Sequence, residues 1–321
     1  MKCNINMIIG LTGSPKHSFI KEKVKQDERN KINTYVFRVE EFNTSELYYK
    51  ALKTFLSDSI NCEELPNETI SIYLDNIDYL KLAERRKVFD LIAQFADTLQ
   101  FYVTAYILAL EIEECIRHKI KKEAAIYKEQ TLFNIPFYEE GFNDIEIIDG
   151  ASLKPVMVVR CDDQRFAEEF YKMVTFNQDI PHHTYTLGVH MAVAQKHVYD
   201  RREDFYDFPH MYIAAMVHDW GKFFTKTYNE QGKALYYDHG EVGAYYLLTH
   251  LNVIPVPERG VTADDILKIL FFVNYHMRPF DFLANDLLLH EAEEIYGAHN
   301  LHDLVVFNHI DKISCGAERD S

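Results

Sequence analysis

The feature that most constrains this chain is a short apolar segment that ends in an adjacent histidine and aspartate. Residues 212–217 are apolar on every side of a helix, as in a helix buried all round, and His218, Asp219, Gly221 and Lys222 follow. Adjacent helical residues point about 100° apart, so His218 and Asp219 can face one point beside the helix. A carboxylate among apolar residues has to be paired, hydrogen-bonded or metal-bound, because burying it bare is costly. A core histidine beside a helix-ending carboxylate is the simpler alternative, so the surrounding sequence has to decide.

Composition describes a globular and rather helical protein. Of the 321 residues, 47% are hydrophobic and 14% aromatic, and there are only 12 Gly and 9 Pro. A chain of this length suggests two domains, each large enough to bury a core. The five cysteines include no Cys-x-x-Cys pair, which argues against a disulfide framework or a cysteine zinc site and fits a reducing cytoplasm.

Charge and hydropathy argue against several classes of partner. A net charge of −16 disfavours broad electrostatic capture of nucleic acid or of an anionic membrane, while leaving room for a local cationic pocket. Residues 1–11 hold too short an apolar run for a signal peptide, and no run approaches the roughly 18 apolar residues that cross a bilayer. We therefore expect a cytoplasmic protein with no membrane partner and no extended nucleic-acid surface.

The first half of the chain alternates predicted strands and helices. The predicted strands are residues 6–10, 34–39, 69–75 and 100–110, with 156–159 as a further candidate. Apolar residues from Leu82 to Leu99 recur at intervals of three, four and seven residues, which predicts an amphipathic helix. This alternation indicates an α/β domain with a doubly wound parallel sheet that binds ligands at the carboxyl ends of its strands.

The turn-rich segment after the first strand partly matches the phosphate-binding pattern G-x-x-x-x-G-K-[ST]. Gly10 and Lys16 match it, whereas Pro15 replaces the second glycine, His17 replaces the hydroxyl residue and Ser18 lies one position late. Proline removes one of the backbone N–H groups that such a loop turns toward phosphate. An ordinary Gly/Pro turn is the alternative. The candidate phosphate-binding residues are Gly10, Gly13, Lys16 and Ser18.

Further segments of this half carry a family pattern. They are the loop 10–16, residues 73–78 followed by 84–86, the basic stretch 113–119, and the closing segment 136–142. Together they resemble the polynucleotide-kinase-like branch of P-loop kinases, over roughly residues 5–150. The resemblance places the acid that activates a 5′-hydroxyl at Glu40 or Glu41. The altered loop predicts a degenerate domain without ATP turnover, and leaves open whether it binds ATP, GTP or an RNA end, or is a scaffold without a ligand.

From residue 161 onward the chain is predicted to be almost entirely helical, which divides it into domains 1–160 and 161–321. Metal-competent side chains recur along the predicted helices, in surroundings where an unpaired polar group is costly. They are His190, His218, Asp219, His239, His276 and Asp311. Neutral imidazoles and carboxylates on facing helices commonly hold a metal in the core of a bundle. Each histidine taken singly is better explained by a structural role, whereas the whole set indicates a metal site.

The order of four of these residues along the chain resembles the H…HD…D signature of the HD phosphohydrolase superfamily: His190, His218, Asp219 and Asp311. The fold of that superfamily is an all-α bundle. His239 and His276 match two extra histidines of members that hold a second metal. Within the resemblance, which spans roughly residues 165–315, segments 182–190 and 236–244 are most similar to the HD domains attached to bacterial tRNA nucleotidyltransferases. The implied activity is metal-dependent phosphoester hydrolysis.

The resemblance also implies roles for single residues. One or two divalent ions (Mn, Fe, Co, Ni or Mg) would be bound by the six side chains, with Asp219 as a ligand that can bridge them. Lys222 and Arg278 are placed to hold phosphate, and His183 to line the pocket, with surface charge as the alternative for Lys222 and Arg278.

The expected substrate is a nucleotide or an RNA end, by analogy with enzymes that carry each half. Termini with a 2′,3′-cyclic or 2′-phosphate are plausible targets, and repair of broken tRNA is the biology they would serve. One alternative is a bifunctional RNA end-healing enzyme whose 5′-kinase half is active. Another is a nucleotide- or RNA-binding regulator in which neither half is catalytic.

Overall fold

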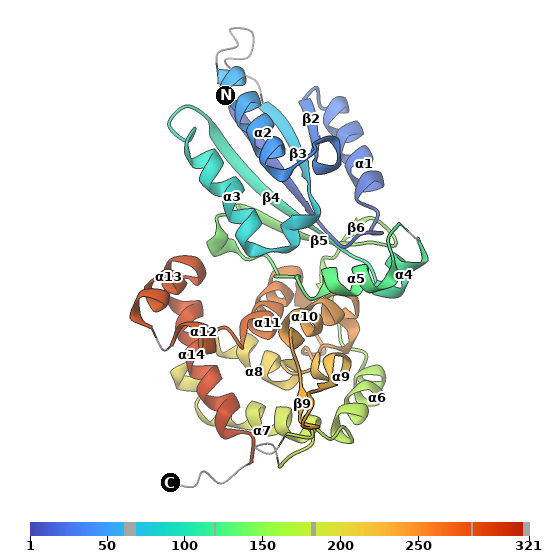
Figure 1. Ribbon diagram of the computed structural model, residues 1–321, viewed down its shortest axis with the longest axis vertical. Coiled ribbons are helices and arrows are strands. Elements are labelled where there is room, and N and C mark those ends of the chain that lie inside the picture. The colour runs from blue at the N-terminus through green and yellow to red at the C-terminus, as the bar shows by residue number, and fades with distance from the viewer. Residues whose placement is uncertain (61–68, 119, 181–183, 284, 317–321) are drawn as a thin grey trace. The chain divides into compact units, whose positions relative to one another are not determined.

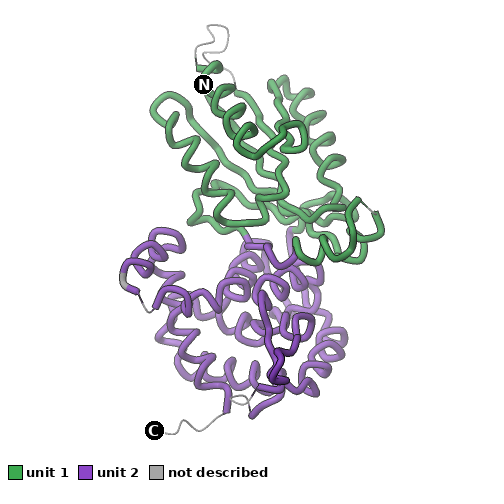
Figure 2. Tube along the Cα trace, viewed as in Figure 1, with its two compact units in different colours: residues 1–129, 136–156 green, residues 130–135, 157–321 purple. Residues whose placement is uncertain are grey.

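The computed structural model describes residues 1–60, 69–118, 120–180, 184–283 and 285–316. The chain divides into two compact units, shown in Figure 2: residues 1–129 with 136–156, and residues 130–135 with 157–321. The first unit is a mixed α/β domain and the second is helical. The first therefore ends close to residue 160, where the sequence placed a boundary. That one short stretch of the first half belongs to the second unit was not expected.

A six-stranded sheet forms the centre of the first unit, in the order β2-β3-β1-β4-β5-β6 (Figure 1). The strands are β1 (Lys2–Ile9), β2 (Asn33–Arg38), β3 (Thr69–Asp75), β4 (Gln100–Ala109), β5 (Asp144–Asp149) and β6 (Lys154–Pro155). All neighbours are parallel except β5 and β6, which are antiparallel. The expected parallel sheet is confirmed, with one antiparallel edge strand. The candidate strand at 156–159 is wrong as an edge of this sheet, because Val158 and Val159 pair with a strand of the second unit.

Helices accompany the strands in the order that a doubly wound sheet requires. They are α1 (Lys16–Arg29), α2 (Ser45–Ile60), α3 (Leu82–Ala93), α4 (Ile112–Arg117) and α5 (Glu123–Gln130), with 3-10 turns η1 (Val39–Glu41), η2 (Ile77–Leu80) and η3 (Tyr138–Glu140). The helix expected up to Leu99 ends at Ala93, where the backbone changes to i→i+3 turns such as Phe95 N–H to Ile92. Ile8, Phe19, Tyr106 and Leu108 belong to the core between α1 and the sheet.

The second unit is built from helices and very short strands. The helices are α6 (Asp163–Val174), α7 (Leu187–Asp200), α8 (Phe208–Val217), α9 (Lys222–Thr225), α10 (His239–Thr249), α11 (Ala263–Tyr275), α12 (Pro279–Phe282), α13 (Asp286–Tyr296) and α14 (Ala298–Ile313), with 3-10 turns η4 (Arg202–Asp204) and η5 (Leu251–Val253). Strand pairs β7 (Val158–Val159) with β10 (Val261–Thr262), and β8 (Thr227–Tyr228) with β9 (Ala234–Leu235), connect loops. Within the described residues, no helix has the length and apolar character needed to cross a membrane.

Helix α8 lies at the centre of this unit, as its sequence predicted. Met211, Ile213, Ala214, Ala215 and Val217 are all buried, and the helix packs against α7 and α11 (Figure 1). Two consecutive alanines leave room for neighbouring helices to approach closely. The C-terminal end of α8 is thereby fixed deep inside the bundle, and this is where the His-Asp pair follows.

The segment 130–135 belongs to the second unit because α11 binds its backbone. The Asn274 amide accepts a hydrogen bond from Ile135 N–H at 2.6 Å and donates one to the Phe133 carbonyl at 3.2 Å. The Tyr275 hydroxyl donates to the Ile135 carbonyl at 3.0 Å, and Phe133 packs edge-on against Tyr245 at 5.2 Å between ring centroids. The buried polar groups of this segment are thus paired within the helical unit.

Candidate metal centre

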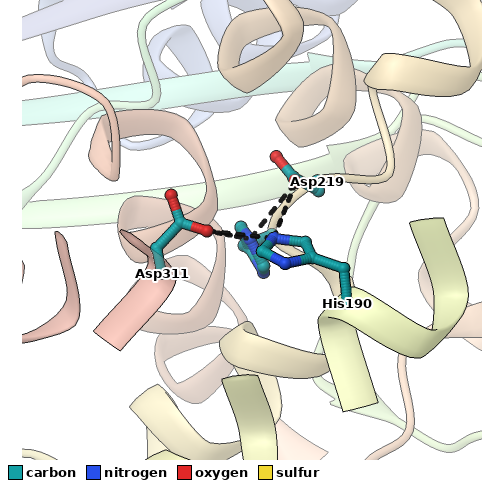
Figure 3. A group of neighbouring side chains, drawn as sticks. His190, Asp219 and Asp311 are labelled. Carbon is teal, nitrogen blue, oxygen red and sulfur yellow. Dashed lines mark ion pairs between the residues drawn. The ribbon is translucent and has the colours of Figure 1, made fainter. Parts of the chain in front are cut away.

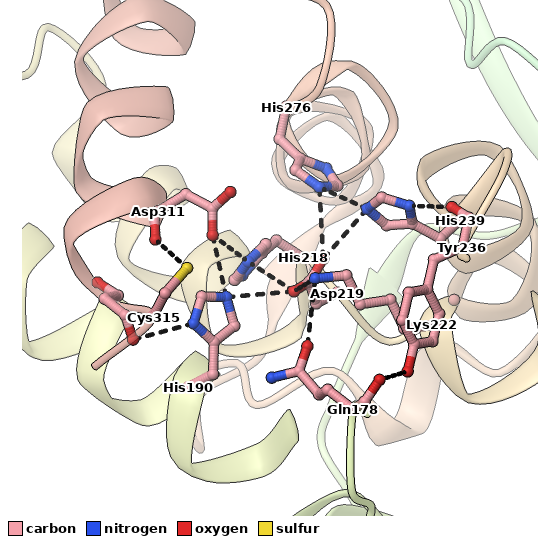
Figure 4. Close-up of polar contacts among 12 residues, drawn as sticks. Gln178, His190, His218, Asp219, Lys222, Tyr236, His239, His276, Asp311 and Cys315 are labelled. Carbon is pink, nitrogen blue, oxygen red and sulfur yellow. Dashed lines mark hydrogen bonds and ion pairs between the residues drawn. The ribbon is translucent and has the colours of Figure 1, made fainter. Parts of the chain in front are cut away.

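Six candidate side chains meet at the ends of five elements (Figure 4). They are His190 in the first turn of α7, His218 and Asp219 directly after α8, His239 at the start of α10, His276 directly after α11, and Asp311 in the last turn of α14. All are buried except Asp311, which is partly exposed. Residues far apart in the sequence therefore place their polar groups at one buried point.

The turn after α8 needs Gly221 to bring Asp219 beside α10. A Cβ atom on Gly221 would lie 1.9 Å from the His239 carbonyl oxygen and 2.7 Å from the Gly243 nitrogen. Only glycine permits two backbones to approach this closely. Gly221 thus contributes to the assembly of the site, because the same contact fixes His239 next to Asp219.

Asp219 connects two groups of nitrogen atoms through its two oxygens. Its Oδ2 lies 3.2 Å from His190 Nε2 and 3.4 Å from His218 Nε2, whereas its Oδ1 lies 3.2 Å from His239 Nε2 and 3.5 Å from His276 Nε2.

Asp311 completes the first group from the other side. Its Oδ1 lies 2.9 Å from His190 Nε2 and 3.3 Å from His218 Nε2, and Figure 3 shows His190 between the two carboxylates. The ligand atoms of His190, His218, Asp219 and Asp311 all lie within 4.8 Å of one another, and so do those of Asp219, His239 and His276. Two sets of metal-competent atoms therefore share one carboxylate.

The backbone holds every imidazole of the site in the same tautomer. The four Nδ1 atoms contact carbonyl oxygens: His190 that of Ser314 at 3.1 Å, His218 that of Ala215 at 2.9 Å, His239 that of Tyr236 at 2.7 Å, and His276 that of Val273 at 2.7 Å. A carbonyl can only accept, so each Nδ1 carries a hydrogen, and each imidazole in its neutral form directs the Nε2 lone pair into the site. This is the arrangement that metal-binding histidines commonly have.

Several acceptor atoms of the site face one another or have no donor. His239 Nε2 and His276 Nε2 are 3.1 Å apart, although both Nδ1 atoms already carry the hydrogens. Among the described residues, His218 Nε2, Asp219 Oδ1 and Asp311 Oδ1 are buried without a hydrogen-bond partner. Facing lone pairs in a buried site are costly unless a cation lies between them. These two carboxylates and four imidazoles therefore fit a bound metal ion, because divalent ions accept both groups as ligands.

The charges of the site follow from burial and from its two carboxylates. Burial would lower the pKa of His218, but Asp219 and Asp311 outweigh it and raise that pKa to about 10. For His276 burial dominates and lowers the pKa to about 4. Burial would raise the pKa of Asp219, but Lys222 and His218 hold it well below its usual range. The protein thus keeps charged carboxylates that attract a cation, and a metal ion would take the place of the proton on His218.

Lys222 is held at the site rather than left at the surface. Its buried ammonium group lies 2.5 Å from Asp219 Oδ2 and 3.4 Å from Gln178 Oε1. Gln178 is fully buried, and its backbone carbonyl accepts a hydrogen bond from the Tyr236 hydroxyl. The sequence pointed to Lys222 but not to Gln178, which lies in an irregular segment where no periodicity or motif marks it.

The remaining candidates lie elsewhere or are paired with other groups. Arg278 Nη2 lies 2.9 Å from Glu241 Oε1, and its Nη1 lies 3.5 Å from Asp281 Oδ2. His183 lies outside the described residues.

In the first unit, Gly10 and Lys16 come together, because the Lys16 ammonium lies 3.3 Å from the Gly10 carbonyl and 3.6 Å from Asp75 Oδ1. Gly13 lies in the same loop between β1 and α1, whereas Ser18 is exposed on α1.

Comparison with known proteins adds no family. No protein-family model matches the sequence, and a search of curated proteins finds no relative. The arguments about function therefore rest on the residues and on the geometry of the site.

Proposed function

We propose that this protein is a metal-dependent phosphohydrolase of the HD type. The observation that carries the proposal is the convergence of four imidazole Nε2 atoms on two carboxylates, with every Nδ1 bound to a backbone carbonyl. The order of these residues along the chain, H…HD…D with two further histidines, supports the same class. A structural histidine cluster would need a donor for each buried acceptor, whereas among the described residues Asp219 Oδ1 and Asp311 Oδ1 have no hydrogen-bond partner.

Two divalent ions would be bound, one by each ligand set. His190, His218, Asp219 and Asp311 would hold the first ion, and His239 and His276 the second, with Asp219 offering one oxygen to each. Four imidazoles favour a transition metal such as Mn, Fe, Co or Ni over Mg alone.

The chemistry of this centre divides between the ions and the chain. A bound ion would act as a Lewis acid toward a phosphoryl oxygen and would lower the pKa of a bound water toward neutral pH. The chain's own part is to fix the imidazole rings, to keep both carboxylates charged, and to exclude water by burial. Lys222 offsets the charge of Asp219, and in the proposed enzyme it and Arg278 also hold the substrate phosphate.

The proposed substrates are nucleotides or RNA ends, with 2′,3′-cyclic and 2′-phosphate termini foremost. The proposal is supported by the resemblance of the first half to polynucleotide kinases, because enzymes of that kind act on the ends of RNA. This support is by analogy.

The test is a hydrolysis assay of the full chain, stripped of metal and reloaded with Mn, Ni, Co or Mg. The panel holds 2′,3′-cyclic and 2′-phosphate nucleotides, RNA ends, dNTPs and an aryl phosphate. We expect metal-dependent release of phosphate or of a ring-opened product, reduced more than about 100-fold in Asp219→Ala. The matched control is Asp200→Ala, which removes an exposed carboxylate of α7 and should leave the rate unchanged. If the folded, metal-loaded protein hydrolyses none of these substrates, the proposal is overturned in favour of a binding regulator.

A further inference from the structure

The loop between β1 and α1, residues 10–16, already has an anion on its backbone, and that anion comes from the chain itself. The Thr12 N–H donates to Glu129 Oε2 at 2.7 Å, and the Thr12 hydroxyl donates to Glu129 Oε1 at 2.8 Å. Both residues are buried, with Glu129 8% exposed near the end of α5. A carboxylate on a loop N–H makes the same charge-assisted contact that a phosphate oxygen makes in a phosphate-binding loop.

Other polar groups of the loop are also satisfied internally. The Ser14 N–H donates to the Leu11 carbonyl at 3.1 Å, the Lys16 N–H donates to the Ser14 carbonyl at 2.8 Å, and Pro15 has no N–H. The Lys16 ammonium, which in such a loop would reach a phosphate, contacts the Gly10 carbonyl and Asp75 instead. The backbone is thus folded onto itself where a phosphate loop would present its donors.

The segment from α4 to α5 is fastened to the loop at further points. Gly13 has a φ of +97°, and a Cβ atom there would lie 2.4 Å from the Cys115 carbonyl oxygen of α4. His118 Nδ1 lies 2.5 Å from the Gly13 carbonyl, and the Lys121 ammonium lies 2.8 Å from Glu129 Oε1. Glu129 therefore reaches Thr12 as part of a packed arrangement that also holds its carboxylate in place.

We propose that Glu129 is the built-in ligand of this loop and closes it against the phosphates of a nucleotide. A phosphate and a carboxylate cannot share the Thr12 donors, because two anions at hydrogen-bond distance from one N–H repel each other. In the native chain the carboxylate thus competes with ATP or GTP for the loop, and its removal opens the loop to them. This closure is independent of the metal centre and of its proposed activity.

The test is isothermal titration calorimetry of the full chain with Mg·ATP and with inorganic pyrophosphate. We expect Glu129→Ala to bind both at least about tenfold more tightly than the native chain, because a charge-assisted competitor has been removed. A second substitution, Lys16→Ala, should abolish the gained binding and so assign it to the loop rather than to the metal centre. The matched control is Glu123→Ala, which removes an exposed carboxylate from the same helix and should gain nothing.

Two results would overturn the proposal. One is native binding as tight as that of Glu129→Ala, since the carboxylate would then not compete with phosphate. The other is a folded Glu129→Ala protein that binds neither probe, since the loop would then be no latent anion site. If Glu129→Ala does not fold, Glu129→Gln keeps the size and one accepting oxygen while removing the charge, and the same two results decide.

Discussion

At the scale of single residues, the site depends on the two oxygens of Asp219. Each oxygen faces a different pair of imidazoles, so the two ligand sets overlap only in this carboxylate. If each set binds an ion as proposed, a change in one set should leave the other set able to bind. The buried Lys222 ammonium on Oδ2 offsets part of the negative charge that the two carboxylates bring into the core.

If the proposed centre binds two ions, we predict that His239→Ala retains one metal ion per chain. The substitution removes a ligand of the second set and leaves His190, His218, Asp219 and Asp311 in place. Metal content after dialysis, measured by mass spectrometry of the elements, checks this. His290→Ala, at an exposed histidine of α13, should keep the native content. Loss of both ions from His239→Ala, or of neither, would contradict two separate sets.

We also predict that Gly221→Ala destabilises the protein by about 3 kcal/mol, because its Cβ would meet backbone atoms that cannot move aside. The comparison is Gly232→Ala, where φ is +74° but nothing lies within 4 Å of the new Cβ. There only the backbone strain remains, about 1–2 kcal/mol. Urea unfolding of both variants measures the difference, and equal losses would show that the close approach to His239 is unimportant.

At the scale of helices, the ends that carry the candidate metal ligands are positioned by contacts at the opposite ends. His210 in the first turn of α8 lies between Asp207 Oδ1, at 2.5 Å from its Nδ1, and Asp265 Oδ1 of α11, at 2.9 Å from its Nε2. Asp303 of α14 accepts the backbone N–H groups of Tyr206 and Asp207. The helices α8, α11 and α14, whose C-terminal ends supply His218, His276 and Asp311, are thereby linked.

We predict that the contribution of His210 to stability depends on pH. Burial would lower its pKa, but Asp207 and Asp265 outweigh burial and raise it above the ordinary 6.5. A raised folded-state pKa means that the stabilisation is complete below pH 6.5 and is lost as the pH rises through the raised value. Urea unfolding should therefore show a gap of about 1 kcal/mol between native protein and His210→Gln at pH 6, and a smaller gap at pH 9. A gap that stays constant or widens with pH would contradict this link.

At the scale of the whole molecule, the general architecture could be predicted from the sequence because periodicity reports it. The parallel sheet and the buried helix α8 follow from alternating and continuous apolar residues, and they are present. The six candidate ligands were recognised from their order, and the structure brings them together.

Contacts between distant parts of the chain were not predictable in the same way. Glu129 lies 117 residues from Thr12, and Gln178 lies 44 residues from Lys222. No local sequence pattern indicates the distant partner of an acid in a helix or of an amide in a loop. The phosphate-loop match likewise depended on residues 10–18 alone, whereas the state of the loop depends on α5.

We predict that Asn274→Leu destabilises the protein by about 2 kcal/mol or more. The substitution leaves the buried Ile135 N–H and Phe133 carbonyl without their side-chain partner. Tyr275→Phe removes the hydrogen bond to the Ile135 carbonyl and should cost about 1 kcal/mol. Urea unfolding measures both losses. Equal stability of Asn274→Leu and the native chain would show that α11 does not need to hold the segment 130–135.

The course of the chain between the two units has a consequence for inheritance. Because residues 130–135 belong to the helical unit while residues 136–156 belong to the sheet unit, no single cut separates the two. A gene fragment that begins after residue 156 would encode the six candidate ligands but not the segment that Asn274 and Tyr275 bind. A recombination event that moved the helical unit by itself would therefore deliver an incomplete bundle. A continuous stretch of the gene that encodes all of either unit also encodes part of the other.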